Sequence, residues 1–172
     1  MGALILSEQA AAGTPASGDV VVYPKSDGLL YWKDDVGTER VIVPTAAQTF
    51  LGADVLLNNT SNYFNVVDTG SIGASGQAWL LIASVALTDT AGAANINVRV
   101  WDSTTVFEEA SMDIRTANAV ETCTIPVIVT PSAAATYSIS CKDTSSTSGK
   151  ALTTGNAGTA NKATSIVAVR LY

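Results

Sequence analysis

The 172-residue chain contains no histidine. Histidine is the usual general base near neutral pH, and it completes the Ser-His and Cys-His nucleophile pairs. The sequence therefore lacks these arrangements, as well as any histidine-based metal site. Cys123 and Cys141 each alternate with apolar residues, as inward-facing strand residues do, so we expect buried thiols. A disulfide would need neighbouring strands, and a reducing site of synthesis favours free thiols.

Carboxylates are the next candidates for chemistry. Asp34, Asp35 and Glu39 lie together around a predicted turn. Their oxygens could bind calcium, which prefers oxygen ligands from loops, or could cap the backbone of the turn. The flanking residues Lys33 and Arg40 favour the capping interpretation.

Two further patterns resemble known sites only superficially. Glu108 and Glu109 are adjacent in a strand segment, so they point to opposite faces and cannot form a two-carboxylate glycosidase site by themselves. The glycine-rich segment Gly70–Gly76 lacks the lysine of a phosphate-binding loop, and no helical pattern follows it. We therefore expect no catalytic, cofactor-binding or metal-binding residues, and no enzymatic activity.

Three aromatic residues are candidates for surface contacts. Trp101 falls on the polar side of an alternating strand beside Arg99, where it could stack on a sugar ring or lie in a subunit interface, and the interface or a structural role is favoured. Tyr31 and Trp32 are adjacent in a strand and so point to opposite faces. One should face the strand's own packing partner, and the other a neighbouring protein.

Composition narrows the classes of partner. Only 14% of the residues are charged and 47% are apolar, a combination typical of β-structures that assemble side by side. The net charge of −6 and the lack of a basic cluster argue against binding nucleic acid. No run of apolar residues is long enough to span a membrane, so we expect no membrane insertion.

The first part of the chain predicts a small β-meander. Three short apolar runs, Asp19–Pro24, Leu29–Trp32 and Arg40–Val43, are separated by two polar turns. The first turn, Lys25–Gly28, contains Asp-Gly, a strong hairpin signal because glycine accepts positive φ. Such a meander is too small to be stable alone and must pack on something else.

From residue 45 onward, short apolar segments recur between turn residues and predict about eight strands, with no convincing helical period. The longest apolar run, Ala78–Leu87, is apolar on both faces, so we expect one face in the core and the other against a subunit partner. Pro126 predicts that its strand is at a sheet edge or bulged. In the final strand we expect Val167, Val169 and Leu171 to face inward.

These patterns predict an all-β fold with three segments. Residues 1–18 form an N-terminal arm and linker, residues 19–44 form a β-meander docking module, and residues 45–172 form a jelly-roll or β-sandwich head of about eight strands.

The N-terminal segment resembles a short module of structural proteins in tailed bacteriophages. The module occurs in head-decorating or head-fibre proteins and in tail-fibre or tail-tip proteins. The resemblance covers about a sixth of the chain. The head is similar to trimeric jelly-roll heads by pattern only. The residues that match the module are Pro15, Ser17, Gly18, Val20, Tyr23, Lys25, Ser26, Asp27, Gly28, Leu30, Tyr31, Lys33, Asp34, Asp35, Gly37 and Glu39.

The resemblance implies a virion structural protein that decorates the capsid or forms a head fibre. Such a protein is assembled in the host cytoplasm and lies on the virion surface. We expect a homotrimer whose N-terminal region docks on the major capsid protein or on tail proteins. The residues expected to dock are Leu4, Leu6, Tyr23, Tyr31 and Trp32.

The alternative function is a tail-fibre or tail-tip protein that binds a receptor or a host surface glycan. Recognition would then lie in the loops Asn58–Asn62, Asp68–Gln77 and Asp143–Asn161. The residues expected on this surface are Asn59, Asn62 and Trp101.

Overall fold

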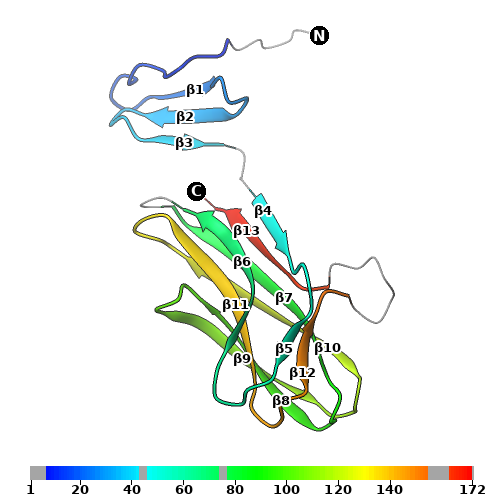
Figure 1. Cartoon of the computed structure of the whole chain (residues 1–172). Helices are drawn as coiled ribbons and strands as arrows, with labels where there is room; N and C mark the ends of the chain where they lie inside the picture. The colour runs from blue at the N-terminus through cyan, green and yellow to red at the C-terminus, as the bar shows by residue number, and fades with distance from the viewer. Residues whose placement is uncertain (1–6, 43–45, 74–76, 155–162, 172) are drawn as a thin grey trace. The chain divides into compact units, whose positions relative to one another are not determined.

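The computed structural model describes residues 7–42, 46–73, 77–154 and 163–171. Within these ranges the regular elements are all β-strands, so the chain is all-β, as its sequence predicts. The chain divides into two compact units, one up to Thr45 and one from Ala46 to Leu171 (Figure 1). Leu4 and Leu6, two of the predicted docking residues, lie outside the described residues.

The first unit is a three-stranded antiparallel sheet with the strands in chain order. Its strands are β1 (Val20–Pro24), β2 (Leu30–Asp34) and β3 (Glu39–Val41). Gly28 adopts a φ of +78° and Gly37 a φ of +87° in the two turns, which explains why glycine stands at both positions. Asp27 and Asp34 accept hydrogen bonds from backbone N–H groups within the same turns.

The second unit consists of two antiparallel sheets packed face to face in a sandwich (Figure 1). One sheet has six strands in the order β4-β13-β7-β12-β5 with β10 also paired to β7, and the other has four in the order β6-β11-β8-β9. The strands are β4 (Ala46–Phe50), β5 (Val55–Leu57), β6 (Phe64–Ile72), β7 (Trp79–Asp89), β8 (Ala94–Trp101), β9 (Val106–Ile114), β10 (Val120–Val129), β11 (Ala135–Asp143), β12 (Gly149–Leu152) and β13 (Ser165–Arg170).

Strand β7 is the centre of the six-stranded sheet. It pairs with β10 along one side, and on the other side first with β13 and then with β12. In the described residues β10 pairs with β7 alone, so it is an edge strand, as Pro126 predicts.

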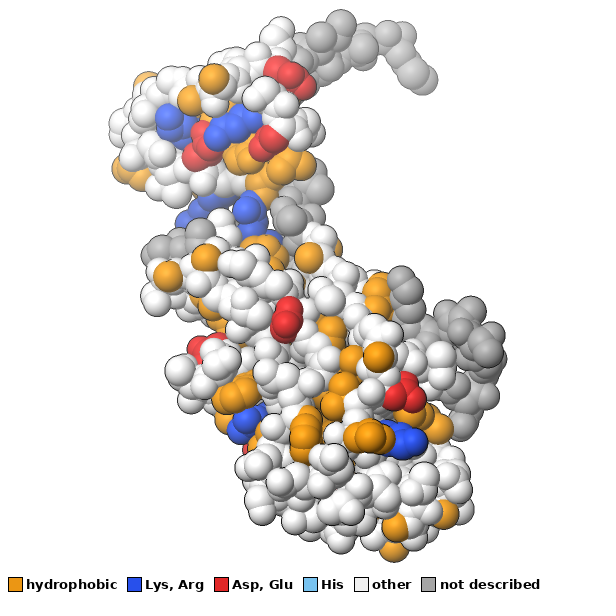
Figure 2. All heavy atoms as spheres, viewed as in Figure 1, with side chains coloured by type: hydrophobic (Ala, Val, Ile, Leu, Met, Phe, Trp, Pro, Cys, Tyr) orange, Lys and Arg blue, Asp and Glu red, His pale blue; other side chains and the backbone are white. Residues whose placement is uncertain are grey.

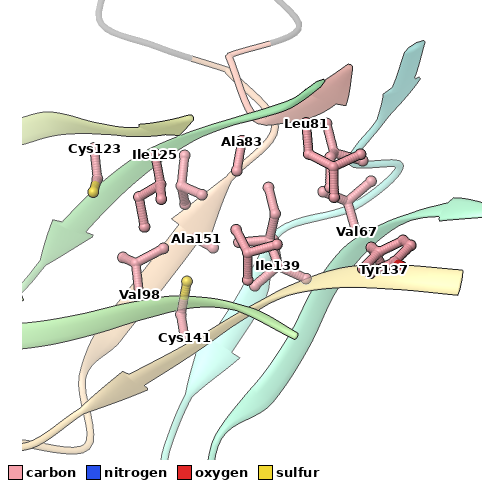
Figure 3. Packing of buried hydrophobic residues seen from close by; sticks show 14 of the residues in the cluster. Val67, Leu81, Ala83, Val98, Cys123, Ile125, Tyr137, Ile139, Cys141 and Ala151 are labelled. Atoms are coloured by element: carbon pink, nitrogen blue, oxygen red, sulfur yellow. The ribbon is translucent and has the colours of Figure 1, made fainter. Parts of the chain in front are cut away.

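The core lies between the two sheets and follows the predicted alternation. Leu81 and Val85 of β7 face Val98 of β8 and Ile139 of β11, and all four side chains are fully buried. Figure 3 shows Cys123 and Cys141 in this cluster, on strands of opposite sheets. Both cysteines are free thiols and both are buried, as expected.

Several strand boundaries differ from the prediction. The apolar segment Phe50–Leu57, which reads in the sequence as one strand, instead begins at the end of β4, bends at residues 52–53 and continues as β5. β6 continues to Ile72, into the segment predicted as a glycine-rich loop, and β12 lies within the predicted loop Asp143–Asn161. The polar residues of these segments pair through their backbones, which composition alone does not reveal.

The predicted orientation of the final strand is wrong. Ile166 and Ala168 are buried in the core, whereas Val167 and Val169 lie on the outer face and Leu171 is exposed. Because β13 carries apolar residues at both alternating positions, alternation alone does not determine which set faces inward.

The burial of the two thiols predicts that they resist chemical modification. Burial raises the pKa of both thiols, and Cys123 contributes further to the shift at Cys141. We expect a thiol reagent to modify them at least about a hundredfold more slowly in the native protein than in denaturant, because the thiolate is the reactive form. The measurement is a colorimetric thiol assay in buffer and in denaturant.

The control for this assay is Val36→Cys, which places a thiol at a side chain that is 80% exposed. This added thiol should react at once in buffer. Rapid reaction of both native cysteines, or the absence of reactive thiols in denaturant, would contradict the buried, reduced pair.

Candidate docking and recognition surfaces

One face of the three-stranded sheet is covered by the chain's own N-terminal arm. Ala12 is buried, and its carbonyl oxygen accepts a hydrogen bond from Lys33 Nζ at 2.9 Å. Tyr23 is only 1% exposed on this face, and its ring lies 6.2 Å from the ring of Tyr31. Its hydroxyl donates a hydrogen bond to Glu39. Tyr23 thus forms the core of the unit. The sequence predicts it as a docking residue, but its side chain could reach a partner only if this packing opened.

Four carboxylates of this unit take part in structural contacts, those of Asp27, Asp34, Asp35 and Glu39. Glu39 also forms an ion pair with Lys25, and Asp35 accepts a hydrogen bond from the Gly18 N–H at 2.7 Å. The hydrogen bond from Tyr31, together with the backbone N–H of Leu29, lowers the pKa of Asp27. Figure 2 shows acidic and basic side chains next to one another on this unit. No group of three or more potential metal ligands occurs among the described residues, and the turn-capping interpretation is the one these contacts support.

The opposite face of the same sheet is open and apolar, and we call it the open face. Val22 pairs with Trp32, and Pro24 with Leu30, so their side chains lie on the same side. Val20 is 64% exposed and Val22 is 43% exposed. The Arg40 guanidinium lies over the Trp32 ring, 5.7 Å from its centroid. The open face consists of Val20, Val22, Leu30, Trp32 and Ile42.

The outer side of the four-stranded sheet carries a stack of cationic and aromatic side chains. The Arg99 guanidinium lies 3.9 Å from the ring centroid of Tyr63 and 3.9 Å from that of Trp101, and we call these three residues the arginine stack. Lys142 Nζ lies 4.7 Å from the Tyr63 ring. Each such cation–π contact contributes about 0.5–1 kcal/mol at an exposed site and more where water is excluded.

Hydrogen bonds hold the arginine stack in place. The Tyr63 hydroxyl donates to Glu109, which also accepts from Asn97 Nδ2 at 3.0 Å. Burial raises the pKa of Tyr63, and the hydrogen bond to Glu109 raises it further. Trp101 is half-buried with its indole N–H enclosed, so its ring is less available to a sugar than the strand pattern suggests.

The predicted recognition residues Asn59 and Asn62 lie in the turn that leads into Tyr63. Asn59 Oδ1 accepts hydrogen bonds from the backbone N–H groups of Ser61 and Asn62, at 2.7 and 3.1 Å. Asn59 is half-buried and caps its own turn, whereas Asn62 is exposed. The structure therefore connects this turn with the arginine stack through Tyr63.

Two open cavities lie at the ends of the sandwich strands. One, of about 270 Å³, is lined by residues that include Asp102, Phe107, Thr130, Ser132 and Tyr137. Burial raises the pKa of Tyr137, and the charge of Asp102 adds to the shift. The second cavity, of about 370 Å³, is lined by residues that include Asn95, Asp113, Ile114, Arg115 and Ser145.

A pair of buried carboxylates, Asp89 and Asp143, was not among the predicted sites. Both are 0% exposed. Ser146 Oγ lies 2.7 Å from an oxygen of each carboxylate, and Ser148 Oγ donates to Asp89. Burial alone would raise the pKa of Asp89, but hydrogen bonds from Ser146, from the Ala91 N–H and from Asp143 outweigh it and lower the pKa. The pair is enclosed and hydrogen-bonded, so it joins the ends of β7 and β11 rather than serving as an accessible acid–base site.

Sequence patterns contained partial signals for the residues that were missed. Val20, Val22 and Pro24 alternate along one side of β1, which is the signal for the open face. Asp89 and Asp143 each end an apolar strand, but nothing in the sequence brings the two together.

No family model matches the chain, and no curated protein matches it. The described residues contain no helix that could cross a membrane.

The lowered pKa of Asp89 predicts how stability depends on pH. A group whose pKa is lower in the folded state stabilises the fold above its unfolded value and loses this contribution as the pH falls through the folded value. Asp89→Asn should reduce the free energy of unfolding by about 1–3 kcal/mol at pH 7, because buried donors lose a charged acceptor. The difference from the wild type should shrink between about pH 5 and pH 2, as measured by denaturant unfolding at several pH values.

The matched control for this experiment is Glu121→Gln, an exposed position on β10. This variant should unfold within about 0.5 kcal/mol of the wild type at each pH. A stability difference for Asp89→Asn that is the same at pH 3 and pH 7 would contradict the role of the ionised carboxylate.

Proposed function

We propose that the chain is a tailed-bacteriophage virion structural protein, a capsid decoration or head-fibre protein. Its N-terminal unit docks on the particle, and its β-sandwich projects outward as the head of a homotrimer. The observation that carries the proposal is the open face, an apolar sheet face on a unit that has almost no core of its own.

The N-terminal unit has few buried side chains to stabilise it. Its described buried apolar residues are Ala12, Tyr23 and Val41, which is a small core for an independent three-stranded sheet. Covering Val22, Trp32 and Ile42 with a partner surface would contribute about 1.5–3 kcal/mol for each side chain that becomes fully buried. Docking thereby supplies the apolar contact that the unit lacks.

Assembly on a particle makes weak individual contacts effective. Several copies joined through their heads engage several sites on one lattice, so the second and third contacts form at high effective concentration. The particle partner is the major capsid protein or a tail protein that presents a complementary apolar surface.

The open face is tested by a charge placed at its centre. Val22→Asp should reduce binding of the full chain to virus particles at least about tenfold, because docking would bury an unpaired carboxylate. The measurement is co-sedimentation of purified protein with particles. Val36→Asp is the matched control, since Val36 is equally apolar and more exposed but lies in the turn beyond β2.

Thermal unfolding of both variants shows whether the N-terminal unit remains folded. Trp32→Ala provides a second substitution on the same face. The docking proposal is overturned if Val22→Asp and Trp32→Ala both bind particles as well as Val36→Asp does.

A second candidate function, glycan recognition by a tail-fibre or tail-tip protein, is favoured by the smaller cavity. Its volume of about 270 Å³ is just below the range of about 300–1,000 Å³ that is usual for small-molecule sites. Phe107 is half-buried and provides apolar contact, and the ring of Tyr137, only 2% exposed, packs behind it with 5.4 Å between the ring centroids. Asp102, Thr130 and Ser132 provide hydrogen-bonding groups. Aromatic surface combined with such groups suits a single sugar ring.

The test of this candidate is a glycan array probed with the full chain, followed by titration of any bound sugar. Asp102→Asn should weaken binding about tenfold or more, because a carboxylate accepts stronger hydrogen bonds from sugar hydroxyls than an amide does. Asp113→Asn, which changes the other cavity, is the control and should bind normally. Absence of binding to any glycan, or equal binding by both variants, counts against this cavity.

A further inference from the structure

We propose that the outer face of the six-stranded sheet binds a second copy of this chain. We call it the apolar outer face. It is formed by outward-facing residues of β10, β7, β13 and β4. The inference rests on the self-association in the proposed function and adds to the trimer a separate face-to-face contact between two copies, which closes as a pair. Its residues are Ala46, Gln48, Leu80, Ile82, Pro126, Ile128, Val167 and Val169.

The strand register builds these residues into two continuous rows. Residues paired across antiparallel strands lie on the same face of a sheet. One row runs across the four strands as Ile128, Leu80, Val169 and Ala46, and the next as Pro126, Ile82, Val167 and Gln48.

The side chains of these rows are accessible to solvent. Ile128 is 62% exposed, and Leu80, Ile82, Val167 and Val169 are half-buried by their neighbours within the sheet. Apolar surface exposed to water is unfavourable in free energy. Contact of these aliphatic side chains with another apolar surface would therefore be stabilising.

The other sheet of the same sandwich shows what a solvent-facing surface looks like in this chain. Many of its outward residues are polar and hydrogen-bonded to each other, as Asn95 is to Asp113 at 2.9 Å and Asn97 to Glu109 at 3.0 Å. An antiparallel sheet with one solvated face normally has this polar side. Along the two rows named above, the six-stranded sheet instead presents mainly aliphatic side chains, with Gln48 as the polar member, and we infer that these rows are covered in the working protein.

Charge argues that the covering partner is another copy. The outward-facing residues of β10, β7, β13 and β4 include no Asp, Glu, Lys or Arg. The chain has a net charge of −6, so two copies repel each other through most surfaces, and an uncharged face allows close approach without burying like charges. A foreign partner would find no charge there to orient it.

The size of the face fits a weak self-contact. Strands lie about 4.8 Å apart and same-face residues about 6.8 Å apart, so the two rows over four strands cover about 260 Å². Two such faces together bury about 520 Å², well below the roughly 1,200 Å² of a standard stable interface. We therefore expect association in the micromolar range rather than a permanent dimer of two faces.

The test measures the mass of the full-length chain in solution at about 1–100 µM by sedimentation equilibrium. The wild type should associate, and Ile82→Asp and Val167→Lys should each raise the dissociation constant at least about tenfold, because each would bury an unpaired charge. Ser111→Asp, on the exposed polar side of β9, is the matched control and should associate as the wild type does.

A crosslinking experiment decides the case if either charged variant fails to fold. Ser84→Cys places a thiol on the apolar outer face, next to Ile82 in the same strand, and should form a disulfide-linked dimer under mild oxidation. Ser111→Cys should not do so at the same concentration.

The outcomes separate this inference from the proposed function. A wild-type chain that remains a monomer at about 100 µM overturns both the self-association and the interface. Association that survives Ile82→Asp and Val167→Lys, with no crosslink at Ser84→Cys, overturns the assigned face and leaves an oligomer formed elsewhere. Neither result affects docking through the N-terminal open face, which particle binding measures separately.

Discussion

The pairing of β7 is the constraint on which the sandwich depends. This strand hydrogen-bonds to three others, so its position fixes β10 on one side and both β13 and β12 on the other. Its inward residues, from Trp79 to Leu87, form much of one wall of the core. The position of β7 therefore sets the plane of the sheet and also places the apolar side chains of Leu80 and Ile82 on its outer face.

The two sheets of the head differ in the polarity of the side chains on their outer faces. The four-stranded sheet presents polar groups that satisfy each other, with Arg99 held between two aromatic rings. The six-stranded sheet presents aliphatic side chains across four strands. The N-terminal sheet repeats this asymmetry at a smaller scale, because its arm covers one face and leaves Val22 and Trp32 on the other. Each unit thus has one face of satisfied polar groups or covered side chains and one apolar face, and the apolar faces are the surfaces on which the proposed assembly rests.

Much of the fold follows from local patterns in the sequence. The turn glycines Gly28 and Gly37, the alternation in β8 and β11, and the edge position of Pro126 were predictable because each depends on neighbouring residues. The direction of β13 was not, since both of its faces are apolar and only its partners decide which faces the core. The same limit applies to the site: the carboxylates of Asp89 and Asp143 meet because strands distant in the sequence pair, and Tyr63 reaches Arg99 for the same reason.

Pro126 in edge strand β10 has a consequence for the kind of assembly the protein can form. An unprotected edge invites further strands to add to a sheet, and unlimited addition leads to fibrils. Proline supplies no N–H group and stiffens the backbone, so this border is a poor template for growth. In the assembly proposed above, contact through sheet faces with this border blocked would favour complexes of finite size over fibrils.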